Sequence, residues 1–409
     1  MINYRNTKLS IFFFAFTFCL LSTGQWFTFG DKAASGTFDA DDMVRPPESL
    51  WSIKISPRGY ALPVAINGPY VYLSNSFGDL TQYNLETGKW NWTSKTLDHT
   101  FGNWSTSGHP AFYQGKAYIG RVTSKCNQPC QPRGLYVLDE KTGRVSDIMF
   151  KNQSIGMILR IGSTLYVEVE NASMGSIVAV DLDTKQIIWK SPEYSTIISF
   201  YFLADRENLY LYAYDAYTGT PPEENRITHV HAFSQTTGKV VWISDAILGQ
   251  HYRVSVADDY VIVAKNWNYD SGTWGNGLAL IDKKSGRIVN SALLHEEQRL
   301  GHHVVRGNSL FCEFSDTRLG SFNIATLKFE YLTPFIPRPR LNWLAEFFAT
   351  KNYLYTFADG LSAYSLATGE RVWSTDKILF HDHYFGDYVV AGKYLIIQQA
   401  DTLKAYYNK

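Results

Sequence analysis

One short phrase recurs along the chain and restricts what it can fold into. It stands as ETGKWNW at 86–92, TTGKVVW at 236–242 and ATGERVW at 367–373. The Gly after Thr suits the positive backbone φ of a tight hairpin turn. The Trp five residues after Thr is large enough to fill a gap between neighbouring sheets. The recurrence therefore predicts one structural unit that is built several times.

The spacing of the phrase predicts the kind of unit. Its marker residues, some in degenerate copies, are Thr87, Thr142, Thr184, Thr237, Ser285, Thr326 and Thr368. The intervals between them are 55, 42, 53, 48, 41 and 42 residues. The base unit is therefore close to 42 residues, and three units contain additional residues. A period of roughly 40–50 residues with several short strands is typical of a β-propeller blade.

Each unit also has the pattern of strands. Runs such as LYVEVE (165–170) and LYLYAY (209–214) precede runs such as IVAVDL (177–182) and LSAYSL (361–366), and the turn phrase follows. They alternate with period two, as half-buried strands do. The aromatic content of 15% also favours strands. The alternative is two unrelated β domains that share turn chemistry.

The two ends of the chain predict how the ring closes. The last unit, DTLKAYYNK (401–409), matches DGLSAYSL (359–366) and stops before any turn phrase. SLWSIKI (49–55) contains Trp51, and no repeat unit precedes it. If Trp51 stands five residues after a marker, as in the other units, that marker is position 46, which lies 41 residues before Thr87. We therefore predict an all-β fold over 46–409. It is an eight-bladed β-propeller of four-stranded antiparallel blades, closed by an N-terminal strand in the last blade, which leaves no exposed sheet edge there.

The N-terminus reads as a separate element. Arg5 and Lys8 precede the apolar run SIFFFAFTFCLL (10–21), and small residues follow at 22–24. This is the plan of a secretory signal peptide over 1–24, followed by a linker over 25–45. An uncleaved signal anchor is the alternative, although the apolar run is shorter than the roughly 20 residues of a membrane span. Both interpretations place the rest of the chain outside the cytosol, secreted or membrane-anchored.

Cysteines and sequons fit that compartment. Cys126 and Cys130, in the Pro-rich CNQPC, could close a short disulfide, and Cys312 lies in an apolar strand pattern that predicts a buried thiol. Four Asn-x-Ser/Thr sequons are candidates for glycosylation: Asn91, Asn103, Asn152 and Asn171.

The repeated phrase resembles the repeat of the pyrroloquinoline-quinone (PQQ) propeller superfamily, A-x-D-x-x-T-G-K-x-x-W. It stands here as VAVDLDTKQIIW (178–189), HAFSQTTGKVVW (231–242), SAYSLATGERVW (362–373) and TQYNLETGKWNW (81–92). The resemblance covers nearly everything after residue 45. It implies the propeller fold, but the superfamily includes both quinoprotein dehydrogenases and binding scaffolds. One such scaffold is the eight-bladed lipoprotein of bacterial outer-membrane β-barrel assembly.

The enzyme alternative, a PQQ-dependent or related dehydrogenase with bound calcium, finds little support in the sequence. The resemblance implies a disulfide between adjacent cysteines and a Glu, Asn and Asp calcium set, and neither is found here. His381, Asp382 and His383 form an HDH stretch, but two histidines do not make a metal site. The leading hypothesis is a non-catalytic extracytoplasmic scaffold that needs no cofactor. With 38 basic and 38 acidic residues, its expected partner is a protein or a glycan and not nucleic acid.

The excess residues predict where a partner binds. They fall between the second and third strands of three units, at 121–134, 215–229 and 266–277. Insertions on one face of a repeat protein usually mark its working surface. Polar and aromatic residues near the inner strands and in one insertion should lie on that face: Tyr60, His109, His251, Tyr252, Trp267, Tyr269, Trp274, His302, His303, Trp343 and His383. The alternative is that these histidines and tyrosines only cap a water-filled channel.

Overall fold

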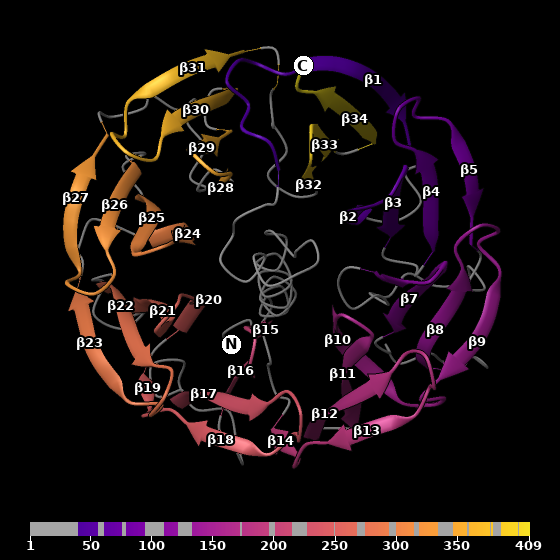
Figure 1. The fold of residues 1–409 in the computed structure, drawn as a ribbon, viewed down its shortest axis with the longest axis horizontal. Coiled ribbons are helices and arrows are strands. Elements are labelled where there is room, and N and C mark those ends of the chain that lie inside the picture. The colour runs from indigo at the N-terminus through magenta and orange to yellow at the C-terminus, as the bar shows by residue number, and fades with distance from the viewer. Residues whose placement is uncertain are drawn as a thin grey trace, which may run out of the picture.

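Eight sheets stand around a ring in the described part of the computed structural model of the chain, six with four strands and two with five, and no helix is assigned there (Figure 1). The structure describes residues 40–55, 61–75, 79–94, 110–121, 133–171, 174–195, 201–214, 227–248, 250–267, 275–293, 300–314, 319–333, 347–357, 360–376, 378, 386–399 and 401–409. The all-β, eight-bladed propeller predicted from the turn phrases is confirmed.

The first four blades follow one another along the chain, and in each the strands pair antiparallel in sequence order. Blade 1 holds β2 (Ala61–Asn67), β3 (Tyr70–Asn75), β4 (Leu80–Asn84) and β5 (Trp90–Thr93). Blade 2 holds β6 (Ala111–Tyr113), β7 (Lys116–Arg121), β8 (Gly134–Asp139) and β9 (Val145–Met149). Blade 3 holds β10 (Ser154–Ile161), β11 (Thr164–Asn171), β12 (Met174–Asp181), β13 (Ile187–Lys190) and the short β14 (Tyr194–Ser195). Blade 4 holds β15 (Tyr201–Ala204), β16 (Asn208–Tyr214), β17 (Ile227–Ser234), β18 (Val240–Ile243) and the short β19 (Ile247–Leu248).

The remaining blades repeat this order until the ring closes. Blade 5 holds β20 (Gln250–Val256), β21 (Tyr260–Trp267), β22 (Gly275–Asp282) and β23 (Ile288–Leu293). Blade 6 holds β24 (Leu300–Arg306), β25 (Ser309–Phe314), β26 (Leu319–Asn323) and β27 (Lys328–Leu332). Blade 7 holds β28 (Phe347–Ala349), β29 (Tyr353–Thr356), β30 (Leu361–Ser365) and β31 (Arg371–Thr375). Blade 8 holds β32 (Gly386–Ala391), β33 (Tyr394–Gln399), β34 (Thr402–Tyr407) and β1 (Glu48–Lys54).

The last blade is built from both ends of the chain, as predicted. β1 pairs antiparallel with β34 and brings Trp51 opposite Ala405. The indole N–H of Trp51 donates to the carbonyl of Leu85 in blade 1, at 2.9 Å. Trp51 therefore occupies the same place in its blade as the Trp of each complete turn phrase.

Residues just before β1 also belong to the ring, although the sequence assigns them to a linker over 25–45. Met43 is buried, its N–H donates to the hydroxyl of Tyr355 at 2.7 Å, and its carbonyl accepts the indole N–H of Trp373 at 2.7 Å. The carboxylate of Asp42 accepts hydrogen bonds from Thr350 and Asn352. This segment takes the place of the turn phrase that blade 8 lacks.

The seams between blades explain why Gly and Trp recur together. The indole N–H of Trp189 in blade 3 donates to the carbonyl of Gln235 in blade 4, at 2.8 Å, and its ring lies against Gly238. Gly238 has a φ of 66°, and a Cβ added there would lie 2.3 Å from Trp189 Cε3. The Gly is thus needed both for its backbone conformation and for the close approach of the ring.

Two seams have no aromatic ring at the Trp position, and the same two lack the Gly; a third has Tyr331 there and keeps Gly369. Lys185 and Leu327 stand where Gly is expected and keep positive φ values of 59° and 51°. The preceding blades carry Asp147 and Asn290 in place of Trp. Lys185 instead makes an ion pair with Asp147, at 3.4 Å. Without an aromatic ring above it the turn accepts a side chain, although its backbone remains left-handed.

The hydrophobic core lies in these seams. Its clusters combine residues of neighbouring blades, such as Tyr210 and Trp242 of blade 4 with Val261 of blade 5. The largest fully buried side chains include Tyr72, Tyr210 and Tyr355, all on second strands. Burial between blades therefore joins the sheets into one ring.

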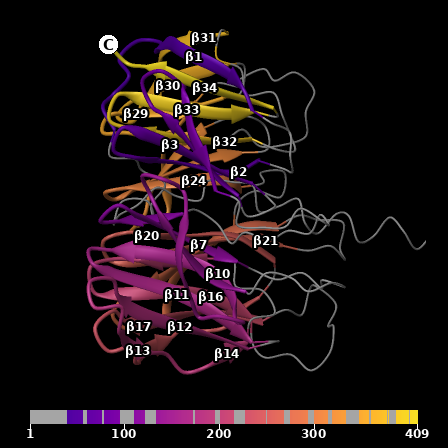
Figure 2. The same ribbon diagram turned by 90° about the vertical axis from the view of Figure 1, so that its right-hand side faces the viewer.

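The strands run between two faces of the ring, which we name by what they carry (Figure 2). The Thr-Gly face carries the turns between third and fourth strands and between first and second strands. The insertion face is the opposite one, where second strands end and third strands begin. The described part of the chain holds no helix with the length and hydropathy of a membrane span.

Candidate functional site

The insertion face is extended in two neighbouring blades. At this face β14 pairs with the first residues of β12, and β19 pairs with the first residues of β17. Blades 3 and 4 therefore carry a fifth strand, whereas the other blades have four in the described ranges. The ladders that border the predicted insertions end here at Arg121 with Gly134, Tyr214 with Thr228, and Trp267 with Gly275. These paired ends place the attachment points of all three insertions on one face.

The structure places only some of the predicted binding residues. His251 and Tyr252 lie near the start of the inner strand β20, Trp267 ends β21, and His302 lies near the start of β24. The backbone thus brings these four to the insertion-face ends of blades 5 and 6. The other predicted binding residues lie outside the described ranges, His303 excepted: Tyr60, His109, Tyr269, Trp274, Trp343 and His383.

His303 takes part in the contact between two blades. It is 1% exposed, and its Nε2 lies 2.7 Å from the hydroxyl of Ser255 on the inner strand of blade 5. It also pairs with Cys312 across the β24–β25 ladder. Burial raises the pKa of the Cys312 thiol well above its usual value, which agrees with the buried thiol predicted from its strand pattern. The side chain of His303 therefore joins blades 5 and 6 and is not exposed to a partner.

Inner strands are irregular where they start at the insertion face. The ladders of β2, β10, β20 and β24 with their second strands each shift register near the first residues. Such bulges re-aim side chains and are frequent next to binding and active sites. Sequence patterns did not reveal them, because each shift lies near the first residues of its strand, where too few residues precede it to show a break in the alternation.

The bulge of β10 holds a pair of carboxylates. Glu168 is buried on β11, and its Oε2 accepts the N–H of Met157 in the bulge, at 3.2 Å. Tyr194 of β14 donates to Glu168 Oε1, also at 3.2 Å. Glu170 lies two residues further along the same strand face, and a Cβ on Gly156 would contact both carboxylates. Burial, and then the charge of Glu168, raise the pKa of Glu170 to about 7.

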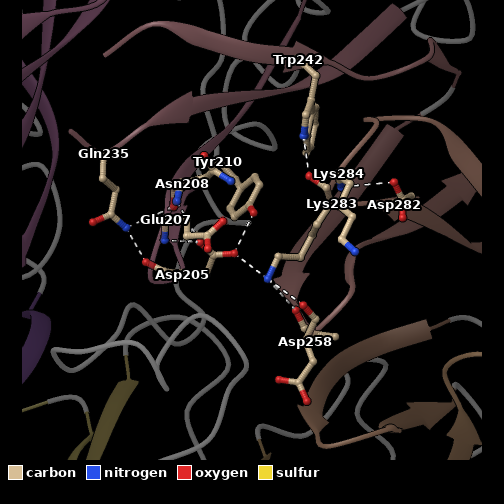
Figure 3. Close-up of polar contacts among 11 residues, drawn as sticks. Asp205, Glu207, Asn208, Tyr210, Gln235, Trp242, Asp258, Asp282, Lys283 and Lys284 are labelled. Atoms are coloured by element: carbon tan, nitrogen blue, oxygen red, sulfur yellow. Dashed lines mark hydrogen bonds and ion pairs between the residues drawn. The ribbon is translucent and has the colours of Figure 1, made fainter. Parts of the chain in front are cut away.

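A polar network lies on the Thr-Gly face, between blades 4 and 5 (Figure 3). Lys283 Nζ lies 2.5 Å from Asp205 Oδ2 and donates to the carbonyls of Ala257 and Asp258, at 3.2 and 2.9 Å. Tyr210 donates to Asp205 Oδ2 at 2.8 Å. Burial raises the pKa of Asp205, but hydrogen bonds from Lys283 and the backbone outweigh it and lower the pKa below its usual value.

This network has the features of a structural contact. The amino group of Lys283 has three acceptors, all within the network, so its donors are used in contacts between the blades. The indole N–H of Trp242 donates to the carbonyl of Lys283 at 2.7 Å, which makes the network part of the Trp seam. At the seam of blades 1 and 2, Glu140 takes the position that Lys283 has at the seam of blades 4 and 5, and its Oε1 accepts a hydrogen bond from the hydroxyl of Tyr72 at 2.5 Å. The polar groups of this face therefore hold blades together.

The candidate sites of modification are placed only in part. Asn91 is exposed on the outer strand β5, where its Nδ2 donates to Gln82 Oε1 at 2.9 Å. Asn152 is exposed in a turn with a φ of 69°. Asn171 ends β11 at the insertion face. Asn103, Cys126 and Cys130 lie outside the described residues, so the disulfide stays a prediction.

The described residues do not fit a calcium-held quinone. Within them, no three His, Cys, Asp or Glu side chains come together in an arrangement that could hold a metal ion. The acidic pair Glu168 and Glu170 has Tyr194 and the backbone N–H of Met157 among its neighbours. We therefore derive no reaction step through such a group.

Comparison with known proteins agrees with the fold. Residues 226–375 match the family described as outer membrane protein assembly factor BamB. No curated protein matches the sequence. The solved structure of BamB from Moraxella catarrhalis is similar with a TM-score of 0.55 and 16% identity, over 89% of this chain and 98% of that one.

Other similar structures have different origins. The computationally designed Ika8 protein has a TM-score of 0.63 at 12% identity, over 88% of this chain and 99% of that one. The quinohemoprotein alcohol dehydrogenase from Comamonas testosteroni has a TM-score of 0.59 at 12% identity, over 91% of this chain and 78% of that one. Identities this low show the fold alone. The family match over residues 226–375 agrees with the resemblance of the turn phrases to the PQQ-like β-propeller superfamily.

Proposed function

We propose that the chain is a non-catalytic, extracytoplasmic β-propeller scaffold that binds a protein or glycan partner through its insertion face. One observation carries the proposal: the two faces of the ring are used differently. On the Thr-Gly face, the recurring Trp, Gly and polar residues are engaged in seams between blades. On the insertion face, fifth strands extend blades 3 and 4, and the attachment points of the three insertions gather there.

The comparisons support a scaffold more than an enzyme. The family that matches residues 226–375 is described as an assembly factor. The dehydrogenases share the fold at 12% identity. Balanced charge argues against nucleic acid as the partner. The signal peptide or signal anchor predicted over 1–24 favours an extracytoplasmic location, and the BamB match supports it.

The test substitutes residues on the two faces. Trp274→Ala and His251→Ala should weaken the capture of a partner from native extracts, or of glycans on an array, because aromatic platforms often dominate such contacts. Matched changes on the Thr-Gly face, Glu86→Ala and Lys284→Ala, should leave capture unchanged, since both residues lie in exposed turns. Loss of capture only in the Thr-Gly variants would overturn the assignment of the face.

A separate measurement tests the enzyme alternative. Purified protein is incubated with PQQ and calcium, and the reduction of a dye is followed with a range of alcohols and sugars. A scaffold gives no dye reduction above a protein-free control. Substrate-dependent reduction would reject the non-catalytic function, whichever face binds a partner.

A further inference from the structure

The two fifth strands of the insertion face are attached to their blades by different chemistry. In blade 4, the hydroxyl of Tyr212 donates to Thr228 Oγ1 at 2.8 Å, and Thr228 donates to the carbonyl of Ile247 in β19 at 2.9 Å. In blade 3, the hydroxyl of Tyr194 in β14 donates to the carboxylate of Glu168 at 3.2 Å. The attachment of β14 therefore involves a group that changes charge with pH, whereas that of β19 uses hydroxyls and a carbonyl.

A second carboxylate lies beside Glu168. Glu170 is the next residue on the same face of β11, and its ladder partner on β12 is Gly175. Gly175 pairs in turn with Tyr194, so Glu170 and Tyr194 lie in one row across the sheet. A Cβ on Gly156, in the bulge of β10, would lie 2.5 Å from Glu168 Oε2 and 3.0 Å from Glu170 Oε1. The two carboxylates therefore converge on Gly156, where no side chain separates them.

The two carboxylates differ in their hydrogen-bond donors. Glu168 is 1% exposed, and it accepts the N–H of Met157 at 3.2 Å as well as the hydroxyl of Tyr194. Glu170 accepts no hydrogen bond and makes no ion pair within the part of the chain that the structure describes. A negative charge on Glu170 would therefore lie beside that of Glu168 without a donor or a cation, whereas a protonated Glu170 adds no charge.

The other groups that face the pair do not offset a second charge. The neighbouring segments of β10, β12, β15 and β16 contain no acidic or basic residue: 154–157, 174–177, 201–204 and 208–214. Burial raises the pKa of Tyr194 well above its usual value, so this phenol stays neutral. Across the seam, the ring of Phe233 lies 6.4 Å from that of Tyr194, and His231 stacks on Phe233 at 6.2 Å. His229 lies beyond His231, and its Nδ1 is 2.7 Å from the carbonyl of Ser244.

We propose that this carboxylate pair makes one corner of the insertion face open and close with pH. The corner consists of the bulge of β10, the end of β11 and the strand β14. It is closed while Glu170 is protonated, because the remaining charge on Glu168 has two donors. When Glu170 loses its proton to solvent, the new charge is hydrated only if the side chain leaves the seam. This movement disturbs β14, because only Gly175 stands between Glu170 and Tyr194 in the ladder.

The direction of the response follows from linkage. Burial, and then the charge of Glu168, raise the pKa of Glu170 to about 7, so the closed corner binds this proton more tightly than the open one. The closed corner is therefore most stable in acid and loses stability as the pH rises towards about 7. An effect on partner capture rests on the proposed function, whereas the opening itself requires no partner.

Hydrogen exchange of the full chain, followed by mass spectrometry at about pH 5 and about pH 8 and corrected for the intrinsic exchange rate, tests the proposal. Protection of the amides in β14 should fall at least about tenfold from the lower to the higher pH, because the pKa of Glu170 is raised by more than one unit. Protection of β19 should not change, since hydroxyls attach it. Glu170→Gln keeps the shape of the side chain without its charge and should make the protection of β14 independent of pH.

Glu193→Gln is the matched control. Glu193 adjoins Tyr194 but is exposed, and it makes an ion pair with Lys190 at 3.7 Å, so this variant should keep the wild-type response of β14. Circular dichroism confirms that both variants are folded. Constant protection of β14 in the wild type would overturn the proposal. A response that persists in Glu170→Gln would also overturn it, since that response would come from the histidines. Partner capture is measured separately, so its failure bears on the proposed function and not on the opening.

Discussion

The contact between Gly238 and Trp189 makes a quantitative prediction about the seams. Gly238→Ala adds a Cβ at a φ of 66°, which costs about 1–2 kcal/mol for an L-residue. The same Cβ would lie 2.3 Å from Trp189 Cε3 and 2.6 Å from Cδ2, so the indole must shift, which costs about a further 1–3 kcal/mol as overpacking. The expected loss in the free energy of unfolding is therefore about 2–5 kcal/mol.

A matched glycine isolates the steric part. Gly162, in the first hairpin of blade 3, has a φ of 58° and nothing within 4 Å of its added Cβ. Gly162→Ala should cost only the backbone component, about 1–2 kcal/mol. Urea unfolding followed by circular dichroism compares the two variants and avoids a signal that depends on Trp.

A double substitution tests whether the indole is the cause. Trp189→Leu removes the ring, so adding Gly238→Ala to it should cost about 1–3 kcal/mol less than adding it to the wild type. Equal losses for Gly238→Ala and Gly162→Ala, or strict additivity in the double variant, would refute the explanation of the seam.

Four further predictions follow from the fold and its charged groups. Deleting residues 46–55 should leave the outer edge of β34 unpaired and lower the melting temperature of the ring; an unchanged melting temperature would contradict closure by β1. Lys283→Met should lower the free energy of unfolding by about 1–3 kcal/mol, because it leaves the partly buried Asp205 without its cation. A loss below about 1 kcal/mol, as expected for an exposed pair, would show that the network adds little. Glu170 binds a proton more tightly in the folded state, so its contribution to stability is lost as the pH rises from about 4.5 to about 7. Glu170→Gln should therefore lose less stability than the wild type between about pH 5 and about pH 8, and identical pH profiles would reject the raised pKa. Mass spectrometry of non-reduced peptides should find Cys126 bonded to Cys130, a short bridge worth at most about 2 kcal/mol; free thiols at both positions in secreted protein would reject it.

The ring could be predicted from the sequence because its seams depend on two residue types with unusual properties. Few residues can replace Gly at a positive φ beneath an indole. Pairs such as Gly238 and Trp189 therefore recur in the sequence as Gly and Trp at a constant spacing. Trp51 is a Trp of this kind with no complete unit before it, and its position was enough to predict closure by the N-terminal strand. The sequence did not reveal the role of Asp42 and Met43, because they stabilise the ring through backbone groups and common side chains.

Polar residues that stabilise the blades could not be recognised from the sequence either, because their residue types are common. Ser191 and Ser244 stand two residues after their Trp, and their hydroxyls accept N–H groups from within the third strands of the same blades. A Trp-x-Ser signal was present, but Ser is common at strand ends for many reasons. Glu168 and Glu170 read as alternate residues of a strand, and only the bulge of β10 shows that both face one buried point. Pairings of this kind depend on which strands meet, and a single sequence does not contain that information.

The closing blade has a consequence for the order of events during synthesis. β1 leaves the ribosome or the translocation pore early, but its partner β34 emerges only after the seven other blades. Until then β1 has no sheet to join, and blade 1 lacks the indole of Trp51 above its turn. Each intermediate blade can dock on the one before it as the chain grows, whereas the final contact brings together the most distant parts of the sequence. Closure is therefore the step with the greatest loop entropy, and we expect it to be the slowest step in folding.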